Sequence, residues 1–212
     1  MKLRKATLLA IIGMSYIFAM TTTNTFFPRI FTNLFLARVN GIMFLLARLT
    51  IAFFFIAFYK EYVHKDQIKL RIATLLVIIG SFAGLVTQIE TLLRLFNMNI
   101  LPYPVLIHYI NAIRPWFSAV FILFFFAALY KEIPHKELMK LKKATFLAII
   151  GSSVLTLVQT LALLNYFYFL KFGRALVNKE LLLLVIIGIL MSSFGFLAHL
   201  LFFISFYYRE EK

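Results

Sequence analysis

The chain has 212 residues, of which 63% are hydrophobic and only 14% are charged, and its formal net charge is +14. This composition excludes a soluble globular domain, which needs far more polar surface to stay dispersed. The absence of cysteine excludes disulfides, thiolate catalysis and cysteine-ligated metal centres. The basic residues flank apolar runs, which indicates contact with the anionic headgroups of a lipid bilayer rather than with nucleic acid.

Apolar runs long enough to cross a bilayer recur along the whole chain. A helix needs about 20 residues to span roughly 30 Å of hydrocarbon. In chain order, the predicted membrane helices cover residues 6–25, 39–59, 72–93, 110–130, 144–168 and 181–207. We therefore expect an all-α integral membrane protein with six transmembrane helices, in which residues 1–212 form a single membrane domain.

The first, third and fifth of these runs open on nearly the same phrase. It reads KLRKATLLAIIGM from Lys2, KLRIATLLVIIGS from Lys69 and KLKKATFLAIIGS from Lys140. The first two phrases agree at ten of thirteen positions and the last two at nine. Apolar composition alone does not keep polar Lys and Thr in register with Gly, so the phrase indicates an internal repeat.

The repeat predicts three tandem hairpins of two helices each. Their bounds are 1–68, 69–139 and 140–212. Every hairpin runs in the same sense, so the repeats are parallel and related by an axis along the membrane normal. A pseudo-threefold bundle is the natural arrangement, and a side-by-side row of hairpins is the alternative.

Positive charge is unevenly divided between the two sides of the predicted membrane. The N-terminus, the linkers 60–71 and 131–143 and the C-terminus together carry fourteen Lys and Arg, whereas the opposite loops carry seven. The positive-inside rule places both termini and these two linkers in the cytoplasm. From its small size and compactness we expect a multi-pass protein of a prokaryotic plasma membrane.

Arg48 falls near the centre of the second predicted span. A charged side chain at that depth costs at least a few kcal/mol, so it usually faces the bundle interior and has a partner. Glu90 is the only acid within a predicted span and is the candidate partner. Two alternatives stay open, because Glu90 has Arg94 four residues away for a local pair and Arg48 is long enough to snorkel outward to the headgroups.

Polar residues recur in the outer half of the odd-numbered spans. Gln88 and Gln159 occupy the same repeat position, and Thr21 is their counterpart in the first span. Such groups are typical of hydrogen bonds between membrane helices, and the alternative is that they line a polar cavity. The candidate ligand-binding residues are Thr21, Arg48, Gln88, Glu90 and Gln159.

Several other residues have structural interpretations. Gly13, Gly80 and Gly151 each follow Ile-Ile, as Gly188 does in the last span, which favours close helix packing over a hinge. We expect His199 to be a packing histidine. A further group is predicted to anchor the outer mouth of the fourth span at the membrane interface. It consists of His108, Asn111, Arg114, Pro115 and Trp116.

The cytoplasmic linkers contain the spacing Glu-x-x-His twice. The pairs are Glu61 with His64 and Glu132 with His135. This spacing places two metal ligands on one helix face in some bundles. The third repeat has no histidine at this position, and basic residues crowd both linkers, so we expect no metal site here.

The sequence favours a binding function over catalysis. It has no glycine-rich phosphate loop, no paired carboxylates and no Ser/His/Asp set, so we expect neither an enzyme nor a cofactor. The first hypothesis is a small multi-spanning protein that binds or transports a small solute through a polar pocket in the outer half of the bundle. The alternative is an accessory, sensory or scaffold protein that binds a membrane-protein partner or lipid.

Overall fold

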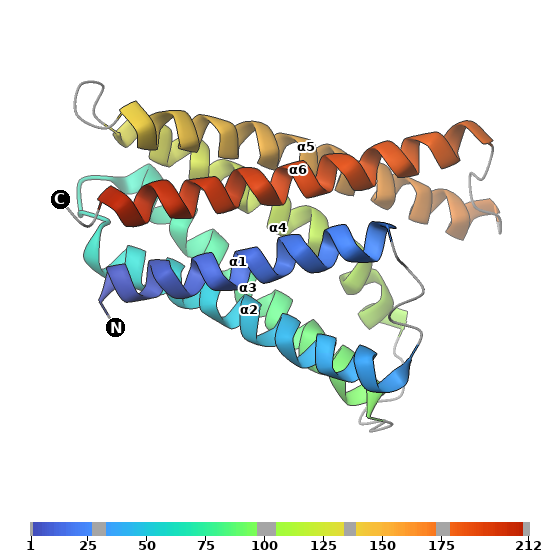
Figure 1. The fold of residues 1–212 in the computed structure, drawn as a ribbon. Helices are drawn as coiled ribbons and strands as arrows, with labels where there is room; N and C mark the ends of the chain where they lie inside the picture. Colours follow the sequence, from blue (N-terminus) through green and yellow to red (C-terminus); the bar gives the residue numbers. More distant parts are fainter. Residues whose placement is uncertain (1, 27–32, 97–104, 134–138, 173–178, 210–212) are drawn as a thin grey trace.

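The computed structural model describes residues 2–26, 33–96, 105–133, 139–172 and 179–209, and these residues fold into long α-helices (Figure 1). In chain order they are α1 (Leu3–Phe26), α2 (Leu34–Glu61), α3 (Ile68–Leu95), α4 (Val105–Glu132), α5 (Met139–Phe172) and α6 (Lys179–Arg209). All six are long and apolar enough to cross a membrane. The predicted all-α fold and the number of candidate membrane helices are therefore confirmed.

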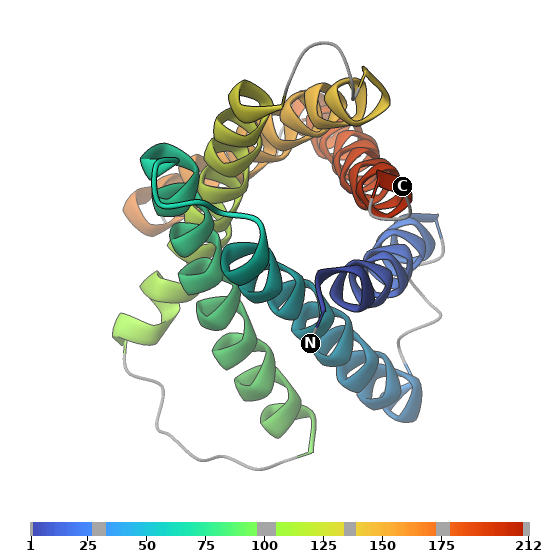
Figure 2. The ribbon, with the colours of Figure 1, turned by 90° about the vertical axis from the view of Figure 1, so that its left-hand side faces the viewer.

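The six helices form a closed ring in chain order (Figure 2). Each helix packs against its neighbours in the chain, and α1 packs against α6 to close the ring. Within the described part of the chain, no other pair of helices brings its backbones close together. A row of hairpins is therefore excluded. We call the end of the bundle where α1 begins and α6 ends the terminal end, and the opposite end the distal end.

The helices extend several residues beyond the predicted spans. α4, for example, begins at Val105 rather than at residue 110, and α3 begins at Ile68 rather than at residue 72. The added residues include the charged flanks, which continue the helix because only the apolar part has to match the hydrocarbon thickness. At the terminal end the first turn of α1 is held by Glu61, whose Oε2 accepts a hydrogen bond from Leu3 N at 2.9 Å.

The repeated phrase forms the buried face of α1, α3 and α5. In each helix the Thr hydroxyl is fully buried and donates a hydrogen bond to the carbonyl oxygen four residues earlier, at 2.7–2.9 Å. The positions buried in all three helices are Leu3, Ala6, Thr7, Ala10 and Gly13 in α1, Leu70, Ala73, Thr74, Val77 and Gly80 in α3, and Leu141, Ala144, Thr145, Ala148 and Gly151 in α5. The three helices thus turn the same face inward. That they are copies of one unit stays a prediction.

The glycines of the phrase lie where the two helices of each hairpin cross. A side-chain carbon at Gly13 would meet Ala47 and Thr50 of α2, and one at Gly80 would meet Phe121 and Ser118 of α4. At Gly151 it would lie 2.8 Å from Cβ of Ala198 and 3.1 Å from Cα of Gly195 in α6. The predicted role in close helix packing is confirmed for Gly13 and Gly151, where a larger residue would move a helix, whereas at Gly80 an added carbon would meet only side chains, the nearest at 3.2 Å.

Phenylalanine side chains from the even-numbered helices fill the axis of the ring near the terminal end. Phe54 of α2 meets Phe203 and Phe206 of α6 with ring centroids 4.8 and 5.7 Å apart, and Phe55 meets Phe125 of α4 at 5.0 Å. We call this set the phenylalanine cluster, and its members are Phe54, Phe55, Phe58, Phe125, Phe126, Phe202, Phe203 and Phe206. All eight side chains are buried, so the cluster blocks the centre of the ring at this level.

Candidate central cavity

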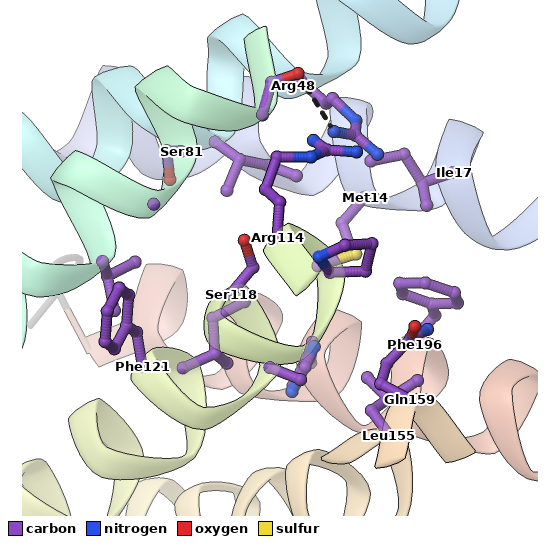
Figure 3. Close-up of a pocket in the computed structure, with 18 of the residues that line it drawn as sticks. Met14, Ile17, Arg48, Ser81, Arg114, Ser118, Phe121, Leu155, Gln159 and Phe196 are labelled. Atoms are coloured by element: carbon purple, nitrogen blue, oxygen red, sulfur yellow. Dashed lines mark hydrogen bonds between the residues drawn. The ribbon is translucent and has the colours of Figure 1, made fainter. Parts of the chain in front are cut away.

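A cavity of about 250 Å³ lies on the distal side of the phenylalanine cluster. Residues of all six helices line it, and Figure 3 shows most of them. Ile51, Ile122 and His199 line the cavity one helical turn from Phe54, Phe125 and Phe202, so the cluster forms its floor. The cavity lies close to the midpoints of α2, α3 and α4, which is near the middle of a membrane that these helices would span.

Arg48 points into this cavity from the middle of α2. Its Nη1 donates a hydrogen bond to the carbonyl oxygen of Gly84 in α3 at 3.3 Å. The guanidinium also lies over the ring of Phe44, at 5.4 Å from the ring centroid, where the face of the ring attracts a cation. The alternative that Arg48 snorkels to the headgroups is therefore wrong, and the side chain faces the interior of the ring.

Arg114 reaches the same point from α4. A side-chain carbon at Gly84 would lie 3.0 Å from Nη1 of Arg48 and 3.3 Å from Nη1 of Arg114. The two nitrogen atoms are thus no farther apart than the sum of those distances. The two guanidinium groups converge on the bare face of α3 that the glycine leaves, and a larger residue would displace them.

The charge of these two arginines is not balanced by a protein carboxylate in the cavity. None of the described lining residues is acidic. Nε of Arg114 is buried and has no hydrogen-bond partner within the described residues. The site therefore holds two positive charges near the middle of the bundle, where an unpaired charge is costly.

The candidate partner of Arg48 is engaged elsewhere. Glu90 Oε1 accepts a hydrogen bond from Arg94 Nη2 at 2.7 Å, one helical turn away in α3. Both side chains are part-exposed, at 25% and 34% respectively. The structure thus has the local pair and not the pair between Glu90 and Arg48, because Glu90 lies nearer the distal end than the cavity does.

The other predicted site residues divide between the cavity and its surroundings. Gln159 of α5 lines the cavity. Gln88 lies one turn beyond Gly84 in α3, and Thr21 lies one turn beyond Ile17 in α1, so both are on the distal side of the lining and neither is part of it. Of the five predicted residues, the structure brings together Arg48 and Gln159.

The prediction that Arg114 anchors the distal mouth of α4 is wrong. α4 begins at Val105, so Arg114 lies more than two turns inside the helix, followed directly by Pro115. Trp116 is also inside, and its Nε1 donates a hydrogen bond to Thr160 Oγ1 of α5 at 2.9 Å. The side chains of His108 and Asn111, and all of His135, lie outside the described residues. The sequence signal for Arg114 was a charged residue directly before a proline within the predicted span.

His199 of α6 lies where the cavity meets its floor. It is 3% exposed, its ring stacks on Phe126 with centroids 5.1 Å apart, and its Nε2 lies 2.7 Å from Ser152 Oγ of α5. The Ser152 hydroxyl donates its single hydrogen to the Ala148 carbonyl oxygen at 2.7 Å. His199 Nε2–H is therefore the donor to Ser152. This pairing agrees with the expected packing histidine.

Replacing Ser152 by alanine is expected to lower the free energy of unfolding by about 1 kcal/mol, in the range found for hydrogen bonds between membrane helices. The change leaves the buried Nε2–H of His199 without its acceptor. Ser153→Ala is the matched control, because the Ser153 hydroxyl is on the exposed face and bonds only within α5. Titration with dodecyl sulfate, followed by the fluorescence of the single Trp116, measures both. Equal stability of the two variants would contradict the role given to the bond between Ser152 and His199.

The chain matches no known protein-family model, no curated protein and no solved structure. The chemistry of the cavity is therefore the basis for a functional proposal. Its walls are mainly apolar, it carries two guanidinium groups at one side, and Gln159 and His199 supply polar groups elsewhere in the lining. Such a site has the form of a pocket for a small molecule, with an apolar lining and a few polar groups that fix orientation.

Proposed function

We propose that this protein binds a small solute in the central cavity, as a transporter or a sensor in the membrane. The observation that carries the proposal is the convergence of Arg48 and Arg114 on a cavity whose described lining has no acidic residue. Two such charges destabilise a membrane bundle unless a bound group interacts with them and offsets the cost of burying them. Apolar residues of similar size would pack the same space at lower cost, so packing alone does not account for the arginines.

The finer parts of the proposal rest on the sequence and on the pattern of burial. Both termini are in the cytoplasm, where the basic linkers contact anionic headgroups, and the host membrane is a prokaryotic plasma membrane. The three hairpins are parallel repeats, which is supported by the common buried face of α1, α3 and α5. In this proposal the cavity lies near the axis that relates the three repeats. The protein binds its solute and has no catalytic role.

A ligand screen with a matched pair of variants tests this function. Thermal unfolding of the purified protein is followed in detergent with a panel of small anions, amino acids, neutral solutes, metal ions and lipids. A solute at a hundredfold excess over its dissociation constant adds about 2.7 kcal/mol to the stability of the folded state. We expect at least one soluble compound to stabilise the parent protein and Arg71→Ala, but not Arg48→Ala. Arg71 is the control because it is exposed and bonds Tyr59 outside the cavity.

The opposite result favours the alternative function. If lipids alone stabilise the protein, and do so equally in the parent and both variants, the cavity is not a solute site. The bundle is then a scaffold or accessory protein whose lipid-facing surface carries its function.

A further inference from the structure

We infer that the solute is a small organic anion, with an oxyanion group held jointly by Arg48 and Arg114 and a short apolar body in the rest of the cavity. This inference rests on the proposed function and specifies its ligand. It follows from the placement of the two guanidinium groups, from the charge of the lining and from the size and character of the remaining walls.

The two guanidinium groups are placed to hold one oxyanion between them. Nη1 of each lies close to the space above Gly84, and the two come from different helices, α2 and α4. A guanidinium donates in a planar fork that matches the oxygens of a carboxylate or a phosphate. Within the described residues, Arg48 uses one N–H on the Gly84 carbonyl oxygen, and both guanidinium groups line the cavity, so further N–H donors are available for a ligand.

The charge of the lining selects against other ligand classes. A cation in the cavity would face two positive charges with no acidic lining residue to offset them. A neutral solute would leave both charges unbalanced in a region where charge–charge interactions are weakly screened. An anion removes this cost, because it supplies the charge that the described lining lacks.

The remaining walls fit an apolar body of limited length. Leu155 and Phe196 line the cavity on the side away from the arginines, and Met14 and Ile17 of α1 add apolar wall beside them. A cavity of about 150 Å³ accommodates benzene, so one of about 250 Å³ has room for on the order of ten non-hydrogen atoms. Carboxylates with about six to eight carbons therefore fill this space, whereas inorganic ions leave most of it empty.

Gly84 offers a variant that keeps both charges. The carbon added by Gly84→Ala would lie 3.0 and 3.3 Å from the two Nη1 atoms, which are the ends of flexible side chains. The helix therefore tolerates the change, and alanine favours a helix over glycine, while the guanidinium groups are pushed apart. This variant separates a loss of binding geometry from a loss of folding.

The experiment measures binding of acetate, butyrate, hexanoate and octanoate to the purified protein by isothermal titration calorimetry. We expect each added methylene to tighten binding about threefold to fourfold until the cavity is full, from the usual gain per buried methylene. Hexanamide and hexylammonium are the neutral and cationic probes of matched length, and each is expected to bind at least tenfold more weakly than hexanoate. Arg48→Gln, Arg114→Gln and Gly84→Ala should each weaken hexanoate at least tenfold, whereas Arg71→Gln should not.

Each contrary outcome overturns a distinct part of the inference. Hexanamide or hexylammonium binding as tightly as hexanoate would remove the anionic ligand but leave the proposed solute site in place. Inorganic phosphate or sulfate binding as tightly as hexanoate would remove the apolar body. Another outcome is that phosphatidylglycerol stabilises the protein, while hexanoate does not. If Arg48→Gln abolishes that stabilisation, the oxyanion belongs to a lipid headgroup. Folded protein that binds none of the soluble probes and no lipid at this site would overturn the proposed function as well.

Discussion

Replacing Phe54 by alanine is expected to lower the free energy of unfolding by about 2–3 kcal/mol, below the 3–5 kcal/mol usual for this change in a soluble core. Phe54 is fully buried and contacts aromatic rings of α2 and of α6, with the Phe203 centroid at 4.8 Å and the two rings nearly perpendicular. Lipid tails are as apolar as the core, so the hydrophobic transfer contribution is largely absent. The lost dispersion contacts and edge-to-face pairs supply the expected cost.

Phe53→Ala is the matched control for this prediction. Phe53 is the neighbouring residue of α2, but 48% of its side chain is exposed on the outside of the ring, where lipid replaces the lost contacts. We expect a change below about 0.5 kcal/mol, as for substitutions away from packed features. Dodecyl sulfate titration measures both variants, and a Phe53→Ala cost equal to that of Phe54→Ala would show that the phenylalanine cluster does not hold the ring together.

Replacing Gly151 by alanine is expected to destabilise the α5–α6 hairpin by about 1–3 kcal/mol, the usual range for overpacking. The added carbon would lie 2.8 Å from Cβ of Ala198 and 3.1 Å from both Cα and the carbonyl oxygen of Gly195. These neighbours are backbone atoms or the first carbon of a side chain, and they move only if a helix moves. The two helices must therefore separate, which also loosens the bond between Ser152 and His199.

Gly188→Ala is the control at the other Ile-Ile-Gly of the same hairpin. A carbon added there would lie 3.7 Å from the nearest methyl group of Val158, which is ordinary van der Waals contact. The change should be neutral or stabilising by up to about 1 kcal/mol, because alanine favours a helix over glycine. The melting temperatures of the two variants, measured in one detergent, test this prediction. A decrease for Gly188→Ala as large as that for Gly151→Ala would contradict the assignment of Gly151 to the helix crossing.

Much of the fold could be predicted from the sequence because the bilayer restricts the choices. A span needs about 20 apolar residues, so the number of membrane helices follows from the number of runs. The glycines of the repeated phrase indicated where helices pack, and the structure adds that the Ala and Thr on the same face are buried in α1, α3 and α5. The helix ends were less predictable, because charged flanks continue a helix without an apolar signal.

The cavity could be predicted only in part, because it depends on how six helices are rotated and shifted along one another. The central position of Arg48 predicted an interior charge, and the structure has it there. Its neighbours were not predictable from spacing within one helix. Glu90 pairs with Arg94 in its own helix, and Arg114, which was assigned to the mouth of α4, lies well inside the helix because α4 begins at Val105. Gly84 carries no sequence signal, although it makes room for both guanidinium groups.

The contact between α1 and α6 has a consequence for biosynthesis. Of the six helices, α1 leaves the ribosome before the others and α6 after them, yet the two lie side by side, with Arg4 Nη2 donating a hydrogen bond to Tyr207 OH at 3.4 Å. Both arginines of the cavity thus enter the membrane before its final wall has been translated. A chain that stops at Phe172 is expected to be degraded by membrane proteases faster than the full chain, and a pulse-chase comparison of the two half-lives tests this. Equal half-lives would mean that the nascent bundle protects its open side without its sixth helix.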